Sequence, residues 1–185
     1  MKTAVPKNQQ LLNTYFTVCT RPDLLATTKV RRFETKIGER VQVAAFPNDL
    51  ERSLEQSSAK FVVFGIPEDV GVKANYGLGG TDTAWVPFLT AFLNIQSNDF
   101  LEGSNILLLG HFDFSDLSNL IEAHAHNYDE RIDAYRHAVY TVDEAVEPLI
   151  KLITQYKKIP IIIGGGHNNA YPIICLLYTS DAADE

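Results

Sequence analysis

Three short runs of consecutive apolar residues, each bounded by polar or glycine-rich sequence, stand out along the chain. They lie at residues 60–66, 105–110 and 159–163 and are rich in β-branched and aromatic side chains. Runs of this length and composition are typical of strands that are buried on both faces of a parallel sheet. The pattern therefore predicts three central strands.

Two segments between these runs carry apolar residues at intervals of three and four, which is the period of an α-helix. The first spans residues 82–95. The second spans residues 135–156, and there the sequence leaves open one helix kinked at Pro148 or two helices broken near Tyr140. Strands that alternate with helices predict βαβ units, and hence an α/β fold with a central parallel sheet.

The first 60 residues show weaker patterns. Leu11, Leu12, Tyr15 and Phe16 share one helical face, which predicts a short helix docked on the core. The side chains of residues 41–45 show a weak strand-like alternation, which suggests a marginal strand. The polar, glycine-containing segment 67–81 is expected to be a loop.

Composition narrows the function classes. The chain has 185 residues, 45% hydrophobic and 21% charged, with a net charge of −7 and no basic cluster larger than residues 29–32. This balance disfavours nucleic-acid and membrane partners. Two cysteines make no disulfide framework, and no apolar run approaches a membrane span or a signal sequence. We expect a soluble, cytoplasmic protein that acts on a small molecule.

The last eleven residues, 175–185, read CLLYTSDAADE. This string matches the translation of the transposase adapter used in tagmentation sequencing libraries, so we interpret it as a non-native tail and exclude it from fold reasoning. On this interpretation, residues 1–174 are the N-terminal portion of a single, longer α/β domain.

The segment GGGHNNAYP at residues 164–172 follows the third predicted strand. In open parallel sheets, ligand-binding residues lie at the carboxyl ends of the strands. Three glycines permit a sharp turn that leaves His167 at the strand tip, where Asn168 and Asn169 cap a following helix or orient the ring. A plain strand-to-helix turn with an incidental histidine is the alternative, because one histidine makes no metal site.

Other chemistry-bearing motifs are weaker. Residues 77–82 lack the last glycine of G-x-G-x-x-G, which disfavours a nucleotide-binding Rossmann site. His111 and Asp113 have a spacing compatible with a metal pair, but a turn or cap explains them equally well. His124 and His126 fit a solvated loop or helix start, and His137 fits a helix surface. No G-x-S-x-G motif is present, and Cys19 has no local activating signal.

Several segments together resemble the ureohydrolase (arginase/agmatinase) superfamily, and its formimidoylglutamase-like branch in particular. They are Asn75 and residues 64–71, 79–80, 94–98, 108–111 and 163–172. The resemblance implies the three-layer α/β/α arginase-like fold, a homo-oligomer, and hydrolysis of N-formimino-L-glutamate to L-glutamate and formamide in histidine catabolism.

The resemblance also implies two Mn²⁺ ions bridged by a hydroxide, with His167 as one metal ligand. Asn75, Asn168 and Asn169 are candidates for supporting the ligand or its loop. The remaining ligands and the catalytic residues are expected beyond residue 174, in Asp-x-His-x-Asp and Asp-x-Asp motifs, so the 185-residue chain is expected to be inactive. Arginases usually have Asp where this chain has Gly166, which makes arginase and agmatinase activity less favoured.

Two alternatives remain open at this stage. The first is an agmatinase- or arginase-type enzyme that acts on a guanidino substrate. The second is a metal-free, non-catalytic member of the superfamily that serves as a binding protein.

Overall fold

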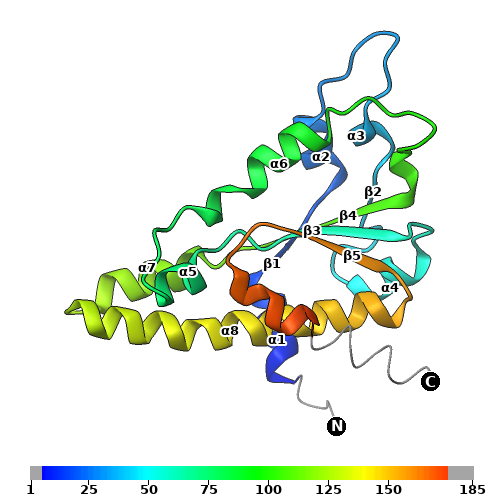
Figure 1. Cartoon of the computed structure of the whole chain (residues 1–185). Coiled ribbons are helices and arrows are strands. Elements are labelled where there is room, and N and C mark those ends of the chain that lie inside the picture. Colours follow the sequence, from blue (N-terminus) through cyan, green and yellow to red (C-terminus); the bar gives the residue numbers. More distant parts are fainter. Residues whose placement is uncertain (1–5, 175–185) are drawn as a thin grey trace.

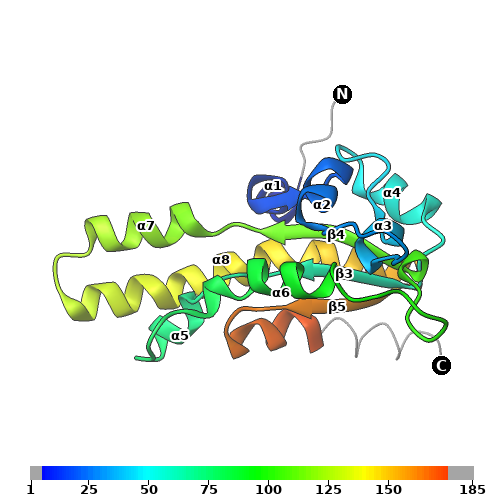
Figure 2. The same cartoon turned by 90° about the horizontal axis from the view of Figure 1, so that it is seen from above.

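Five strands form one sheet, with β3 and β4 as its inner strands, in the computed structural model, which describes residues 6–174 (Figure 1). The strands are β1 (Phe16–Val18), β2 (Gln42–Val43), β3 (Phe61–Gly65), β4 (Ile106–Phe112) and β5 (Ile159–Ile163). Their order is β1-β4-β3-β5, and β2 also pairs with β4. The three apolar runs are thus neighbouring parallel strands, as predicted, and Figure 2 shows them side by side. The expectation that all three are central and buried on both faces holds for β3 and β4 but is wrong for β5, which lies at the edge of the described sheet and exposes Ile159 and Ile161.

The sheet is mostly rather than entirely parallel. β2 runs parallel to β4, but β1 pairs with β4 in the antiparallel direction, with Phe16 opposite Phe112. The predicted central parallel sheet is therefore confirmed for β2–β5, and the antiparallel β1 is an addition at its edge. Antiparallel edge strands on otherwise parallel sheets are common, and this short strand carries no local signal that would have revealed it.

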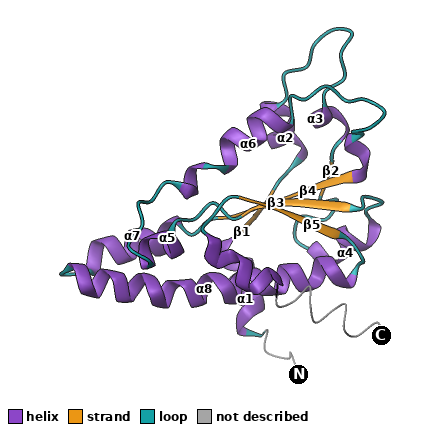
Figure 3. Cartoon of the chain, viewed as in Figure 1, coloured by secondary structure: helices purple, strands orange, loops and turns teal. Residues whose placement is uncertain are grey.

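Helices lie on both faces of the sheet (Figure 3). The α-helices are α1 (Lys7–Tyr15), α2 (Arg21–Thr27), α3 (Ile37–Arg40), α4 (Leu50–Gln56), α5 (Val70–Ala74), α6 (Trp85–Phe92), α7 (Ser115–His124) and α8 (Tyr128–Gln155). The 3₁₀ helices are η1 (Thr81–Thr83), η2 (Gly103–Asn105) and η3 (His167–Asn169). Residues 170–174 are also helical.

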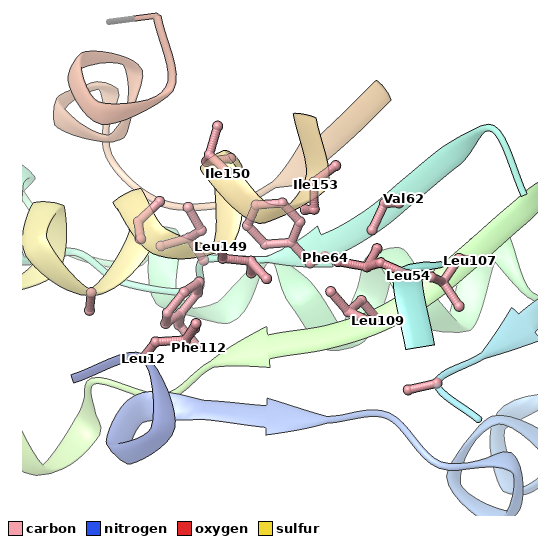
Figure 4. Packing of buried hydrophobic residues seen from close by; sticks show 14 of the residues in the cluster. Leu12, Leu54, Val62, Phe64, Leu107, Leu109, Phe112, Leu149, Ile150 and Ile153 are labelled. Carbon is pink, nitrogen blue, oxygen red and sulfur yellow. The ribbon is translucent and has the colours of Figure 1, made fainter. Parts of the chain in front are cut away.

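Each face of the sheet has its own apolar core, because successive strand residues point to opposite sides. On one face, Phe64 and Leu107 pack with α1, α4 and α8, and Figure 4 shows Leu149 and Ile153 of α8 next to Phe64. On the other face, Val63 and Leu108 pack with residues of α2, α3 and α6. The described chain is therefore an α/β fold with a mostly parallel central sheet.

Helix α8 is continuous over 28 residues, so of the alternatives that the sequence left open, two helices broken near Tyr140 is wrong. Its N-cap is Asn127, whose side chain accepts a hydrogen bond from the backbone N–H of Glu130. Pro148 lies inside the helix, next to the fully buried Leu149. Packing of the apolar stripe on the sheet keeps the chain helical past the proline, against its local preference.

Short elements account for most of the other differences. The segment expected to be a loop contains α5, and the polar stretch after β4 contains α7. The predicted N-terminal helix is confirmed as α1, with Leu12 buried, but Phe16 belongs to β1. Helices of one or two turns are stabilised by tertiary packing rather than by their own periodicity, so the sequence pattern does not reveal them.

A register shift in β4 decides on which face of the sheet the side chains of its last residues lie. Val63 of β3 pairs with Leu108, whereas Phe64 pairs with Gly110, so β4 holds one extra residue there. A bulge of this kind reverses which face the following side chains occupy. His111 accordingly lies beside Trp85 of α6, with their ring centroids 5.7 Å apart.

The tail at residues 175–185, interpreted as adapter-derived, lies outside the described residues. Within residues 6–174, no helix has both the length and the apolar character that a membrane crossing needs.

Candidate functional site

The loops that follow β3 and β5 meet at the carboxyl edge of the sheet. Gly65 pairs with Ile163, and the backbone N–H of Ile66 donates to the carbonyl of Ile163 over 2.9 Å. Helix α5 and the 3₁₀ turn η3 lie next to each other beyond this point. The sheet topology therefore brings residues 67–81 against the glycine-rich turn, although about a hundred residues separate them in sequence.

Two glycines make the turn after β5 possible. Gly164 has φ +87° and Gly165 has φ +83°, both in the left-handed region that other residues rarely adopt. A Cβ atom on Gly165 would also lie 2.6 Å from the carbonyl oxygen of Ile66. Glycine is thus required there for both backbone conformation and space, as expected for a sharp turn.

His167 begins η3 directly after this turn, and its side chain is exposed. It lines a hollow of about 370 Å³ together with Asn75, Asn168 and residues of the α5 segment. The imidazole makes no hydrogen bond to any residue that the structure describes. The ring is therefore at a concave surface with both nitrogens free, rather than packed in the core.

The asparagines of the site behave differently from one another. Asn169 is buried, and its Nδ2 donates to Oε1 of Glu68 over 2.7 Å. Asn168 donates weakly to Oδ1 of Asn169 over 3.4 Å, while its own Oδ1 is buried with no partner among the described residues. Asn75 is the C-cap residue of α5 and is exposed in the same hollow as His167.

No hydrogen bond within the described residues joins Asn75, Asn168 or Asn169 to the imidazole of His167. The interpretation that the asparagines orient the ring directly is therefore not met. Asn169 instead fixes the backbone turn that carries His167.

Glu68 is the residue that the sequence pattern missed. Its side chain is 2% exposed, and Oε1 accepts hydrogen bonds from the backbone N–H of Gly166 and from Asn169, each over 2.7 Å. Oε2 accepts from the backbone N–H of Gly71 over 3.3 Å. The sequence held one signal for this role: two acidic residues, Glu68 and Asp69, follow soon after a buried apolar strand. A charge so close to the core needs hydrogen-bond or ionic partners.

A second carboxyl group lies close to Glu68 in α8. Burial and the negative charge of Glu68 raise the pKa of Asp143 to about 6. Its Oδ1 is buried without a hydrogen-bond partner in the described part of the chain. Asp143 therefore carries an electrostatic cost that the neutral form avoids.

A separate polar pocket of about 390 Å³ lies at the carboxyl ends of β3 and β4. It is lined by residues that include Lys73, His111, Asp113 and Glu122. Burial lowers the pKa of His111, an effect that the negative charge of Asp113 partly offsets. Asp113 accepts a hydrogen bond from the backbone N–H of Ser115, which supports the interpretation as a turn at the start of α7.

The remaining candidates lie away from this edge. His124, His126 and His137 are exposed on or beside α7 and α8, as expected. Cys19 is half-buried, and burial together with nearby Asp23 raises the pKa of its thiol to about 11. Cys19 is therefore held as the thiol at neutral pH, the form that is the weaker nucleophile.

The donor set is too small to hold a metal ion by itself. Among residues 6–174, no group of three or more His, Cys, Asp or Glu side chains could bind one. The free imidazole of His167 suits a site with nitrogen and oxygen ligands, but it is a single donor. The described residues thus supply one candidate nitrogen donor and do not by themselves form a metal site.

Together these features define an α/β protein with an open, anchored histidine turn at the carboxyl edge of its sheet. No protein-family model, no curated protein and no solved structure matches the chain.

Proposed function

We propose that this chain is part of a metal-dependent hydrolase of C–N bonds in linear amidines, with an arginase-like three-layer fold. The proposed reaction is that of formimidoylglutamase, in which N-formimino-L-glutamate and water give L-glutamate and formamide. The proposal rests on the ureohydrolase resemblance, in which Gly166 replaces the aspartate usual in arginases and so favours a formimino over a guanidino substrate.

The observation that supports it is the setting of His167. Its imidazole is exposed at the carboxyl edge of a parallel sheet and makes no hydrogen bond within the described residues. A ligand histidine needs a ring nitrogen that is free to bind the metal, and the turn presents the His167 imidazole with such a nitrogen. Bound Mn²⁺ ions would lower the pKa of a coordinated water and so provide the nucleophile.

This chain's own residues would then hold and frame the metal ligand. Glu68 and Asn169 fix the turn, and Asn75 lines the hollow beside the imidazole. Because one imidazole cannot hold two ions, the proposal requires further metal ligands beyond Ile174. It therefore also states that the 185-residue chain is inactive by itself. A cytoplasmic homo-oligomer acting on a small molecule belongs to the same proposal.

The test uses the protein extended past Ile174 by the reading frame that continues it, loaded with Mn²⁺. We expect formamide release from N-formimino-L-glutamate. His167→Ala should lower kcat/KM at least about 100-fold, because it removes a metal ligand. His137→Ala, which removes an exposed histidine of α8, is the matched control and should leave the rate unchanged.

The other outcomes separate the alternatives. Urea release from arginine or agmatine would assign the guanidino chemistry instead. An extended protein that neither binds Mn²⁺ nor hydrolyses any of the three compounds would overturn the proposal and favour a binding protein.

A further inference from the structure

We propose that Glu68 is a positioning residue, whose buried carboxylate holds the His167 turn in place. The inference deepens the proposed function, and only its catalytic consequence rests on that function. The hold on the turn itself is a property of the fold and can be measured without any metal or substrate.

The geometry is that of one carboxylate shared by three donors from two loops. Oε1 lies 2.7 Å from both the backbone nitrogen of Gly166 and Nδ2 of Asn169. Oε2 lies 3.3 Å from the backbone nitrogen of Gly71, at the start of α5. Gly166 and Asn169 flank His167 on its two sides, so both of Glu68's contacts with the turn fix the backbone that carries the imidazole.

The position of Glu68 is itself fixed by its own backbone. Its N–H donates to the carbonyl of Ile66 over 2.9 Å, and its carbonyl accepts from the hydroxyl of Thr81 over 2.6 Å. The backbone of Glu68 is therefore held between the end of β3 and η1, which limits how far the carboxylate can follow a turn that moves. A rigid acceptor and buried, charge-assisted bonds make a strong restraint.

The glycines of the turn permit this approach. A Cβ atom on Gly165 would lie 3.1 Å from Oε1 of Glu68, and one on Gly166 would lie 3.4 Å from it. A side chain at Gly165 would therefore crowd the carboxylate, whereas the distance at Gly166 is an ordinary contact. Gly165 thus provides both the backbone turn and space for the Glu68 carboxylate.

A carboxylate is required, because an amide cannot satisfy all three donors. No described residue forms a salt bridge with Glu68, so its charge is balanced by N–H groups alone. In Glu68→Gln, an NH₂ group replaces one of the two carboxylate oxygens. Whichever way the amide is turned, this NH₂ donor faces at least one N–H donor, and that hydrogen bond is lost. The size of the side chain is unchanged, so the substitution tests the bonds rather than the packing.

The experiment measures amide hydrogen exchange and ¹H–¹⁵N spectra of the 185-residue chain. We expect Glu68→Gln to speed exchange of the Gly166 amide at least about tenfold and to shift the His167 ring resonances. Asp69→Asn is the matched control: it changes a neighbouring buried acid that bonds Gly80 and Lys73 and does not reach the turn. It should change Gly166 exchange less than about twofold.

Equal effects of the two substitutions on Gly166, or no effect of Glu68→Gln, would overturn the inference. If Glu68→Gln does not fold, the wild-type chain decides instead. Its Gly166 amide must then exchange at least about tenfold more slowly than the exposed Gly164 amide, and unprotected exchange at Gly166 overturns the inference.

In the extended protein, we expect Glu68→Gln to lower kcat more than it raises KM. If Glu68→Gln speeds Gly166 exchange but the extended protein has no hydrolase activity, the inference about the turn stands and only the proposed function is rejected. The two failures are thus distinguishable.

Discussion

The carboxylate of Glu68 accepts a hydrogen bond from the backbone N–H of Gly166 over 2.7 Å, although 98 residues separate them in sequence. This bond ties the loop after β3 to the loop after β5 at the carboxyl edge of the sheet. Since the contact is buried, its loss leaves polar groups that water cannot reach. Both the stability of the edge and the placement of His167 therefore depend on one side chain.

Glu68→Ala should lower the free energy of unfolding by about 3 kcal/mol, because three donors lose their buried acceptor. Urea denaturation followed by circular dichroism measures the change. Asp82→Ala, an exposed acid in η1, is the control and should cost less than about 0.5 kcal/mol. A loss at Glu68 no larger than that at Asp82 would contradict the buried acceptor role.

Two alanine substitutions separate backbone strain from crowding in the turn. Gly164 and Gly165 have nearly the same positive φ, but a Cβ on Gly164 would make only ordinary contacts, the nearest with Ala84 at 3.5 Å. We expect Gly164→Ala to cost about 1–2 kcal/mol and Gly165→Ala clearly more, since its Cβ overlaps the Ile66 carbonyl. Thermal or urea unfolding of both variants provides the comparison, and equal costs would show that crowding contributes nothing.

Asp143 should make stability depend on pH in one direction. Its pKa is raised from 3.8 to about 6 in the folded state, so the folded chain binds this proton more tightly than the unfolded chain does. Stability from this group is therefore present below about pH 4 and is lost as pH rises through about 6. Asp143→Asn should stabilise the protein by about 1 kcal/mol at neutral pH, after allowance for its partial exposure, and less at pH about 4.

Urea unfolding of wild type and Asp143→Asn at both pH values measures this effect. Glu147→Gln, at an exposed position of the same helix, is the matched control and should change stability little at either pH. A stabilisation by Asp143→Asn that is the same at both pH values would reject the electrostatic origin.

Strand β5 should be a site of self-association. Within the described residues it pairs only with β3, and Ile159 and Ile161 are 44% and 39% exposed. Unpaired strand edges that carry apolar side chains promote aggregation, which lysine suppresses. Ile161→Lys should therefore reduce light scattering of concentrated protein, with a change in unfolding free energy below about 1 kcal/mol.

The neighbouring residue is the natural control. Ile162 points to the other face and packs against the core beneath α8, so Ile162→Lys should destabilise the fold and increase scattering. Unchanged scattering of Ile161→Lys would show that this edge is not the associating surface.

The sequence by itself determined the α/β class and the parallel centre of the sheet. The runs that form β3, β4 and β5 are apolar at successive positions, a pattern typical of strands in parallel sheets. In β3 and β4 it corresponds to burial on both faces, whereas in β5 Ile159 and Ile161 are exposed. The stripe of α8 and the place of His167 after β5 follow from the same local periodicity. Its role as a metal ligand stays a prediction.

Tertiary structure alone decided the remaining features. The antiparallel β1, the continuity of α8 across Pro148 and the short helix α5 depend on packing against distant residues, which local patterns do not encode. The same holds for Glu68: nothing near it in sequence shows that Gly166 and Asn169 donate to it. A buried charge is stable only through its partners, and here the topology of the sheet brings them together.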